Sequence, residues 1–206
     1  MNNTRGFWPM RDLPTVFWLV ATAASTLVHP FVPAPRWLMI HLLLLGAIGH
    51  AILVWSRYFA DTLLRCPPTP RRSQDVRLAI FNLGVVCVVI GVVGSLWPVT
   101  LVGAVAVAAA VLWHGAVMLR QLASALASRF APTIRYYVSA AALLPVGLGF
   151  GVWLARDVAS PLHEQLRAAH VAINVFGWIG LTVLGTLVTL WPTILRTRIA
   201  EGAETA

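Results

Sequence analysis

Residues 78–97 read LAIFNLGVVCVVIGVVGSLW, a run of 20 residues without a charged side chain. A transmembrane α-helix needs about 20 predominantly apolar residues to cross the hydrocarbon core of a bilayer. The run begins directly after Arg77 and ends at Trp97, two residue types that favour the membrane–water interface. This stretch therefore predicts a membrane-spanning helix, which sets the fold class of the chain.

Apolar stretches of similar length lie on both sides of this run. The predicted helices cover residues 14–32, 36–65, 78–97, 99–120, 135–155 and 160–192, followed by a cytoplasmic tail at 196–206. Pro98 and Pro161 mark helix starts, because proline is well tolerated in the first turn of a helix. We therefore expect one all-α membrane domain over residues 1–206, a polytopic bundle of about six transmembrane helices.

The composition agrees with this fold class. The chain is 59% hydrophobic and only 11% charged, whereas a soluble domain carries about 25% charged residues. So much apolar surface cannot be hidden in the core of a 206-residue globule, so the expected partner is the lipid bilayer. The net charge is +8, but no basic run alternates with exposed aromatic residues, so we do not expect nucleic-acid binding.

The basic residues predict the orientation of the helices. All 15 are arginines, and arginine gathers in cytoplasmic loops. With both termini in the cytoplasm, 12 of them fall on inner segments and three on outer ones. The inner set is Arg5, Arg11, Arg57, Arg65, Arg71, Arg72, Arg77, Arg120, Arg129, Arg135, Arg196 and Arg198, and the outer set is Arg36, Arg156 and Arg167. The sequence thus predicts a multi-pass protein of the cell membrane.

The second predicted helix is longer than a bilayer requires. Its pattern continues to Arg65, and Arg57, Asp61 and Arg65 follow one another at intervals of four residues. Side chains at this spacing share one face of a helix. We expect this charge ladder to protrude into the cytoplasm.

Histidines recur inside or at the edges of the predicted helices, where ionisable side chains are costly and usually functional. At a rise of 1.5 Å per residue they form an outer layer, about 7 Å below the outer helix ends, and an inner pair at about 21–22 Å. The outer layer consists of His29, His41, His163 and His170, and the inner pair of His50 and His114.

Imidazoles presented at one level by different helices form the axial ligand set of a haem b. We therefore predict His41 and His170 as the ligands of an outer haem, and His50 with His114 as an inner cofactor site. At 100° per residue His41 and His50 face opposite sides of their helix, so one cofactor cannot use both.

Three other interpretations stay open. Copper suits imidazole and thioether ligands, for which the outer layer offers His29, Met39, His41, His163 and His170. Alternatively, the histidines only form hydrogen bonds between the helices of a non-redox scaffold or assembly subunit. A small-solute or metal transporter is less favoured, because the carboxylates fall at helix edges or in loops. No set of catalytic side chains is predicted.

Two segments resemble a known family. Residues 40–60 read IHLLLLGAIGHAILVWSRYFA, and residues 170–198 contain HVAINVFGWIGLTVLGTL followed by WPTILRTR. They resemble the N-terminal membrane domain of actinobacterial multicopper oxidases of the copper nitrite reductase type. More distantly they resemble haem–copper membrane proteins of nitric oxide metabolism.

This resemblance implies electron transfer, with quinol oxidation at the membrane and delivery of electrons to an outer copper site. His41 and His170 are the positions carried over as metal ligands. The chain departs from the family at His50, where the family has a small polar residue, and in lacking the copper domain. We therefore expect at most a quinol-oxidising component, not a complete nitrite reductase. Its expected partner is an extracytoplasmic cupredoxin protein or a second membrane subunit.

Overall fold

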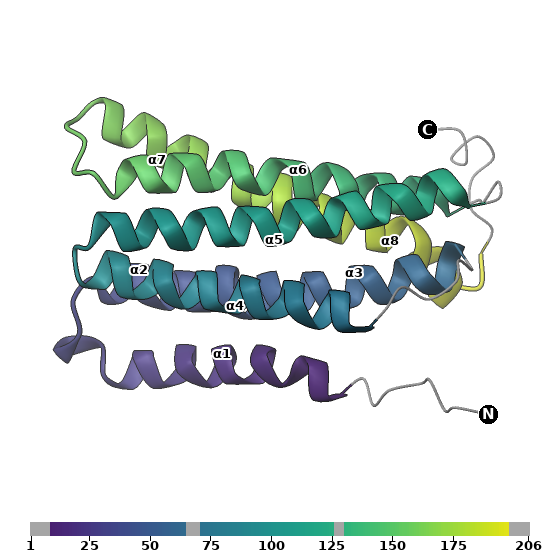
Figure 1. Cartoon of the computed structure of the whole chain (residues 1–206), viewed down its shortest axis with the longest axis horizontal. Coiled ribbons are helices and arrows are strands. Elements are labelled where there is room, and N and C mark those ends of the chain that lie inside the picture. Colours follow the sequence, from purple (N-terminus) through teal and green to yellow (C-terminus); the bar gives the residue numbers. More distant parts are fainter. Residues whose placement is uncertain (1–8, 65–70, 126–129, 198–206) are drawn as a thin grey trace.

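The computed structural model describes residues 9–64, 71–125 and 130–197. Within these ranges the chain forms helices and no strand. The helices combine into six rods that run along the long axis of the molecule (Figure 1). The prediction of an all-α bundle is confirmed.

Two of the six rods contain a π-helical segment. The first rod is α1 (Pro9–Leu27), which the short 3₁₀ turn η1 (His29–Phe31) follows. The second consists of α2 (Pro35–His41), the π-helical η2 (Leu42–Ile48) and α3 (Gly49–Leu64). The next three are α4 (Arg71–Val93), α5 (Trp97–Ser124) and α6 (Ala131–Leu154). The last consists of α7 (Leu162–Ala172), the π-helical η3 (Ile173–Gly180) and α8 (Leu181–Ile194).

The helix bounds differ from the predicted ones where polar residues continue a helix. α4 begins at Arg71 rather than at residue 78, and α1 begins at Pro9 rather than at residue 14. α1 also ends earlier than predicted, at Leu27 rather than at residue 32, where the chain turns into the 3₁₀ segment His29–Phe31. Hydropathy marks the part of a helix that lipid surrounds, whereas the backbone hydrogen bonds continue through charged residues beyond it. Residues 198–206 of the predicted tail lie outside the described residues.

Five of the rods in the described ranges are long and apolar enough to cross a membrane: Pro35–Leu64, Arg71–Val93, Trp97–Ser124, Ala131–Leu154 and Leu162–Pro192. The remaining rod is α1, whose first turns carry Arg11 and Asp12. The chain is therefore a multi-pass membrane protein.

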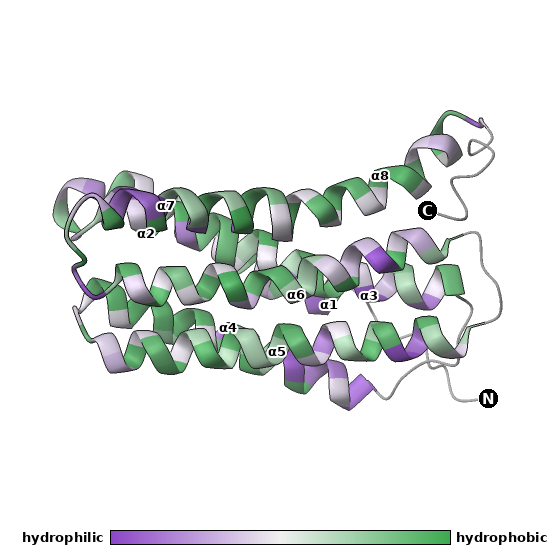
Figure 2. Cartoon of the chain, turned by 90° about the horizontal axis from the view of Figure 1, so that it is seen from above, coloured by the Kyte–Doolittle hydropathy of each residue, from purple (hydrophilic) through white to green (hydrophobic). Residues whose placement is uncertain are grey.

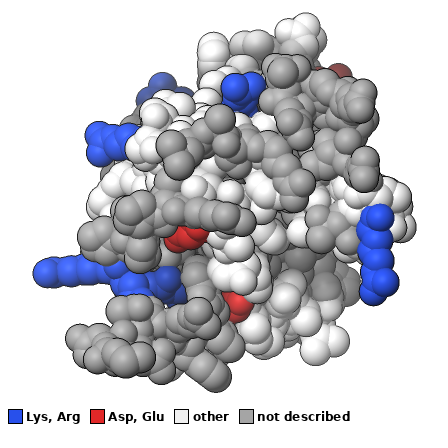
Figure 3. All heavy atoms as spheres, turned by 90° about the vertical axis from the view of Figure 1, so that its right-hand side faces the viewer, with Lys and Arg blue, Asp and Glu red and all other residues white. Residues whose placement is uncertain are grey.

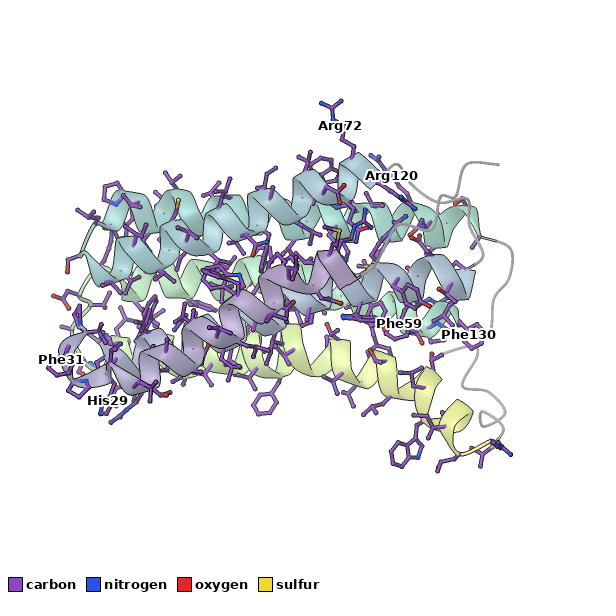
Figure 4. The ribbon with its side chains drawn as sticks, turned by 90° about the horizontal axis from the view of Figure 1, so that it is seen from below. His29, Phe31, Phe59, Arg72, Arg120 and Phe130 are labelled. Carbon is purple, nitrogen blue, oxygen red and sulfur yellow. The ribbon has the colours of Figure 1, made fainter. Side chains whose placement is uncertain are left out.

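The rods alternate in direction along the chain. α1 begins and α8 ends at the same end of the bundle (Figure 1), as an even number of rods requires. Arg72 and Arg120 lie toward this end, and His29 and Phe31 lie at the other (Figure 4). Hydrophilic residues concentrate toward the helix ends, and the middle parts of the rods are mostly hydrophobic (Figure 2).

Arginines are visible on the end face at which α1 begins (Figure 3). We call this end the inner end, following the arginine distribution, and the opposite end the outer end. Of the 12 arginines predicted to be cytoplasmic, Arg5, Arg65, Arg129 and Arg198 lie outside the described residues.

Glycines bring α4 and α5 into close contact. A Cβ atom added to Gly103 on α5 would lie 2.6 Å from the backbone nitrogen of Val88 and 2.7 Å from the carbonyl oxygen of Gly84. On the α4 side, a Cβ atom at Gly84 would lie 2.9 Å from the carbonyl oxygen of Gly103. Small residues of this kind let helix backbones approach each other in membranes, where association relies on close packing.

We expect Gly103→Ala to destabilise the folded protein by about 1–3 kcal/mol, because the backbone of α4 cannot move aside without a shift of the whole helix. The measurement is the free energy of unfolding in detergent. Gly149→Ala is the matched control, since an added Cβ there meets nothing within 4 Å. Equal losses in the two variants would show that the close approach of α4 and α5 at Gly103 contributes nothing to stability.

Arg57, the first residue of the predicted charge ladder, does not protrude, which corrects the expectation for this residue. Arg57 is 1% exposed and lies inside the bundle. It forms an ion pair with Asp61 at 2.8 Å, and its Nη1 donates to Gln121 Oε1 on α5 at 2.7 Å. Gln121 Nε2 donates to Asp61 Oδ1 at 2.7 Å, which closes a three-membered network. Arg65 lies outside the described residues.

A second arginine, Arg77 on α4, is also 1% exposed. Its guanidinium lies 5.5 Å from the centre of the Trp113 ring, and its Nη1 donates to Ser73 Oγ at 3.3 Å. Arg57 and Arg77 are close enough to each other to interact electrostatically. The rule that assigns arginines to cytoplasmic loops uses only the position of each arginine in the sequence. It does not show whether the side chain points to solvent or into the bundle.

Candidate functional site

A cavity of about 410 Å³ lies near the outer end, between the second rod and the last one. α4, α5 and α6 also contribute to its wall, most of which is apolar. Among the polar side chains that line it are His41, His163, Arg167 and His170. Its volume falls within the range of small-molecule and cofactor sites.

His41 is the last residue of α2 and is held by the preceding turn. Its Nδ1 lies 2.8 Å from the carbonyl oxygen of Trp37. A carbonyl oxygen can only accept a hydrogen bond, so Nδ1 carries the proton and the Nε2 of the neutral ring keeps its lone pair. The Trp37 ring also stacks on the imidazole, with the centres 4.0 Å apart and the planes inclined by 19°.

His170, on α7, is held in the same way by a different helix. Its Nδ1 lies 2.8 Å from the carbonyl oxygen of Gly147 on α6, so here too the proton sits on Nδ1. Gly151, one turn further along α6, leaves room for the ring, since a Cβ atom there would lie 2.9 Å from His170 Cε1. The amide nitrogen of Asn174 donates to the carbonyl oxygen of His170 at 2.8 Å.

The two rings lie close together. The centres of the His41 and His170 rings are 6.1 Å apart, and their planes are inclined by 27°. Two imidazoles that bind one metal ion, each at about 2.0 Å and from opposite sides, would have their ring centres about 6 Å apart if both nitrogens lay on the line between the centres. Within the described parts of the chain, neither Nε2 has a hydrogen-bond partner.

The hydrogen bond from Nδ1 to a backbone carbonyl is a feature that His41 and His170 share with metal-binding histidines. Metal-binding histidines almost always donate the second ring N–H to a carbonyl, carboxylate or water, which fixes the tautomer and the ring orientation. His41 and His170 each have a backbone carbonyl as the partner of Nδ1 in the structure. Both rings therefore keep the lone pair of Nε2, the atom through which a histidine of this tautomer would bind a metal.

π-helical segments accompany both histidines. η2 follows His41 directly, and η3 begins three residues after His170. π-helical turns are rare in proteins and frequently occur at functional sites. The wider turn changes the angular position of all later residues around the helix axis, compared with a regular α-helix. The sequence alone therefore does not show which faces of these two rods meet.

The predicted inner pair has a different environment. His50 is fully buried, with its Nε2 donating to the carbonyl oxygen of Arg11 at 2.8 Å and its Nδ1 accepting from Asn82 at 2.9 Å. His114 Nε2 lies 2.9 Å from the Ser56 hydroxyl. Both nitrogens of His50 are thus bonded to the protein, and a metal at His50 would have to replace one of these bonds.

The remaining histidines of the outer layer separate into two kinds. His163 and His170 both line the cavity, in agreement with their spacing of two helical turns. His29 is exposed, and its Nδ1 lies 2.9 Å from the carbonyl oxygen of Thr26. Met39 does not line the cavity, and the described residues contain no group of three or more His, Cys, Asp or Glu side chains placed to hold a metal.

Two features of the cavity escaped the sequence analysis. The backbone carbonyls of Trp37 and Gly147 orient the histidines, and every residue has such a carbonyl, so no sequence signal marks them. The other is Trp178, which lines the cavity and is 3% exposed, with an Nε1 that has no hydrogen-bond partner among the described residues. Its spacing of eight residues from His170 places it deeper on the same rod.

The fold and the cavity define the class of this protein: a polytopic helical membrane protein with a histidine-lined cavity near its outer end. No protein-family model, curated protein or solved structure matches the chain.

Proposed function

We propose that this protein binds a haem b between His41 and His170 and transfers electrons within the membrane. The observation that carries the proposal is the pair of imidazoles with ring centres 6.1 Å apart, each donating its Nδ1 proton to a carbonyl. Two neutral imidazoles from different helices are one of the ligand sets that hold haem iron.

The rest of the cavity also fits a haem. Its wall is mostly apolar, as the flat face of a macrocycle requires, and the absence of a side chain at Gly151 lets the His170 ring lie against α6. Arg167 is exposed on the lining and suits a propionate, because guanidinium groups bind carboxylates through two parallel hydrogen bonds. A bound haem would supply a carrier for one electron at a time.

The electron donor we propose is quinol, and the acceptor an extracytoplasmic cupredoxin protein or a second membrane subunit. Both follow from the resemblance to the membrane domain of multicopper oxidases. The position of the cavity near the outer end supports the acceptor, because an extracytoplasmic acceptor approaches from that side. On this proposal the protein is the quinol-oxidising component of an oxidoreductase in the cell membrane.

The test is the absorption spectrum of the purified protein. We expect a Soret band that shifts on reduction with dithionite, and a haem-to-protein ratio near one. A folded preparation without this band, even after haem is added, would overturn the proposal and leave a scaffold role for the histidines. Metal uptake into vesicles above the level of empty vesicles would instead favour a transporter.

A further inference from the structure

Trp37 contacts His41 in two ways: one fixes the tautomer of the imidazole, and the other restricts the rotation of its ring. Its backbone carbonyl accepts the Nδ1 proton at 2.8 Å, which fixes the tautomer. Its indole ring stacks on the imidazole at 4.0 Å, with the planes inclined by 19°, which restricts rotation of the imidazole about its bond to Cβ. Trp37 also lines the cavity, so it lies next to whatever His41 binds.

The ring of His170 has the same kind of carbonyl contact but a glycine beside it in place of the indole. The carbonyl of Gly147 holds its Nδ1, and Gly151 lies so close that a side chain there would touch Cε1. The three aromatic rings of Trp37, His41 and His170 thus follow one another with successive plane angles of 19° and 27°. Both imidazoles donate to a backbone carbonyl, and the plane of His41 is in addition held by the stacked indole of Trp37.

We infer that Trp37 is the positioning residue of His41: its indole holds the imidazole plane nearly parallel to that of His170, ready for ligation of one iron. This inference rests on the proposed function, because it gives the orientation of the ligands in the haem complex. The backbone carbonyl remains in every Trp37 variant, so substitution removes the stack and leaves the contact that fixes the tautomer in place.

The relative orientation of two axial imidazoles can be measured directly. In low-spin ferric haem, nearly parallel imidazole planes give a rhombic electron paramagnetic resonance spectrum, whereas perpendicular planes give a single, highly anisotropic signal. The wild-type protein is expected to give the rhombic spectrum, since its planes are inclined by 27°.

The test compares Trp37→Leu with Trp37→Phe. In Trp37→Leu we expect the rhombic spectrum to broaden or to be replaced by the anisotropic one, and haem transfer to apomyoglobin to become about threefold to tenfold faster. Trp37→Phe keeps a ring over His41 and is expected to retain the wild-type spectrum. Trp153→Leu is the matched control, since Trp153 is 51% exposed and does not line the cavity.

The outcomes separate the inference from the proposed function. A wild-type spectrum and haem-transfer rate in Trp37→Leu would overturn the role of Trp37 and leave haem binding intact. A wild-type protein that binds no haem would overturn the proposed function instead. In haem-free protein, nitrogen NMR is expected to show His41 protonated at Nδ1 in both wild type and Trp37→Leu. Loss of this tautomer in the variant would contradict the inference that the carbonyl fixes the tautomer and the indole fixes the ring plane.

Discussion

His41→Ala and His170→Ala are each expected to lower the haem content of the purified protein by at least about tenfold. Loss of a group that merely orients a metal-binding histidine already weakens metal binding about tenfold to a hundredfold, and loss of the ligand itself removes more. A single remaining imidazole also leaves the iron open to other ligands. The measurement is the Soret absorbance per protein, together with the reduced-minus-oxidised spectrum.

The controls use histidines that the structure places elsewhere. His29 is exposed and bonded to the Thr26 carbonyl, so His29→Ala is expected to keep the wild-type spectrum. His163→Ala changes the cavity lining without removing either ligand, and it is expected to retain haem. Full spectra in both His41→Ala and His170→Ala would refute the assignment of the outer site.

Histidine-to-alanine variants also test the predicted inner site at His50 and His114. Retention of about half of the haem in His41→Ala, and its loss in His50→Ala or His114→Ala, would indicate a second cofactor. We expect one haem per chain, because the two nitrogens of His50 already bond to Arg11 and Asn82.

The largest expected effect on stability comes from Asp61→Ala. Asp61 binds Arg57 through an ion pair of 2.8 Å and also accepts from Gln121, and Arg77 lies within electrostatic reach. Removing it leaves two buried guanidiniums without this carboxylate. Breaking a buried ion pair costs about 3–5 kcal/mol. Because the Asp61 side chain is 28% exposed, we expect about 3 kcal/mol, measured as the free energy of unfolding in detergent.

Asp75→Ala is the matched control for this prediction. Asp75 also pairs with an arginine, Arg11, at 3.0 Å, but its side chain is 57% exposed. Exposed ion pairs contribute about 0–1 kcal/mol, because water solvates both charges when the pair is broken. Losses of similar size in Asp61→Ala and Asp75→Ala would show that the Arg57 network contributes no more than a surface pair.

The class of fold was readable from the sequence, because hydropathy is a local property. Residues 78–97 hold no charge over the length of a bilayer, and α4 covers most of that run. The helix ends were less accurate. The start of α4 at Arg71 carries charged residues that a hydropathy pattern assigns to a loop, although they continue the same backbone hydrogen bonds.

The direction of polar side chains was not readable in this way. Arg57 has the spacing of an exposed ladder, yet it lies in the interior because Gln121 on α5 offers an acceptor 64 positions further along the chain. Arg77 borders the apolar run and was assigned to the cytoplasmic surface, whereas it packs beside Trp113. Whether a charged residue near a membrane surface turns outward depends on partners from other helices.

For the candidate site, the sequence alone determined which residues have the chemistry and the level at which they lie: His41 and His170 at similar depth in different helices. The three-dimensional arrangement decided the rest. The π-helical turns set the rotation of both rods, and the carbonyls of Trp37 and Gly147 select the tautomer that leaves each Nε2 free. Depth follows from counting residues along one helix, whereas the facing of two rings depends on how separate helices rotate and pack against each other.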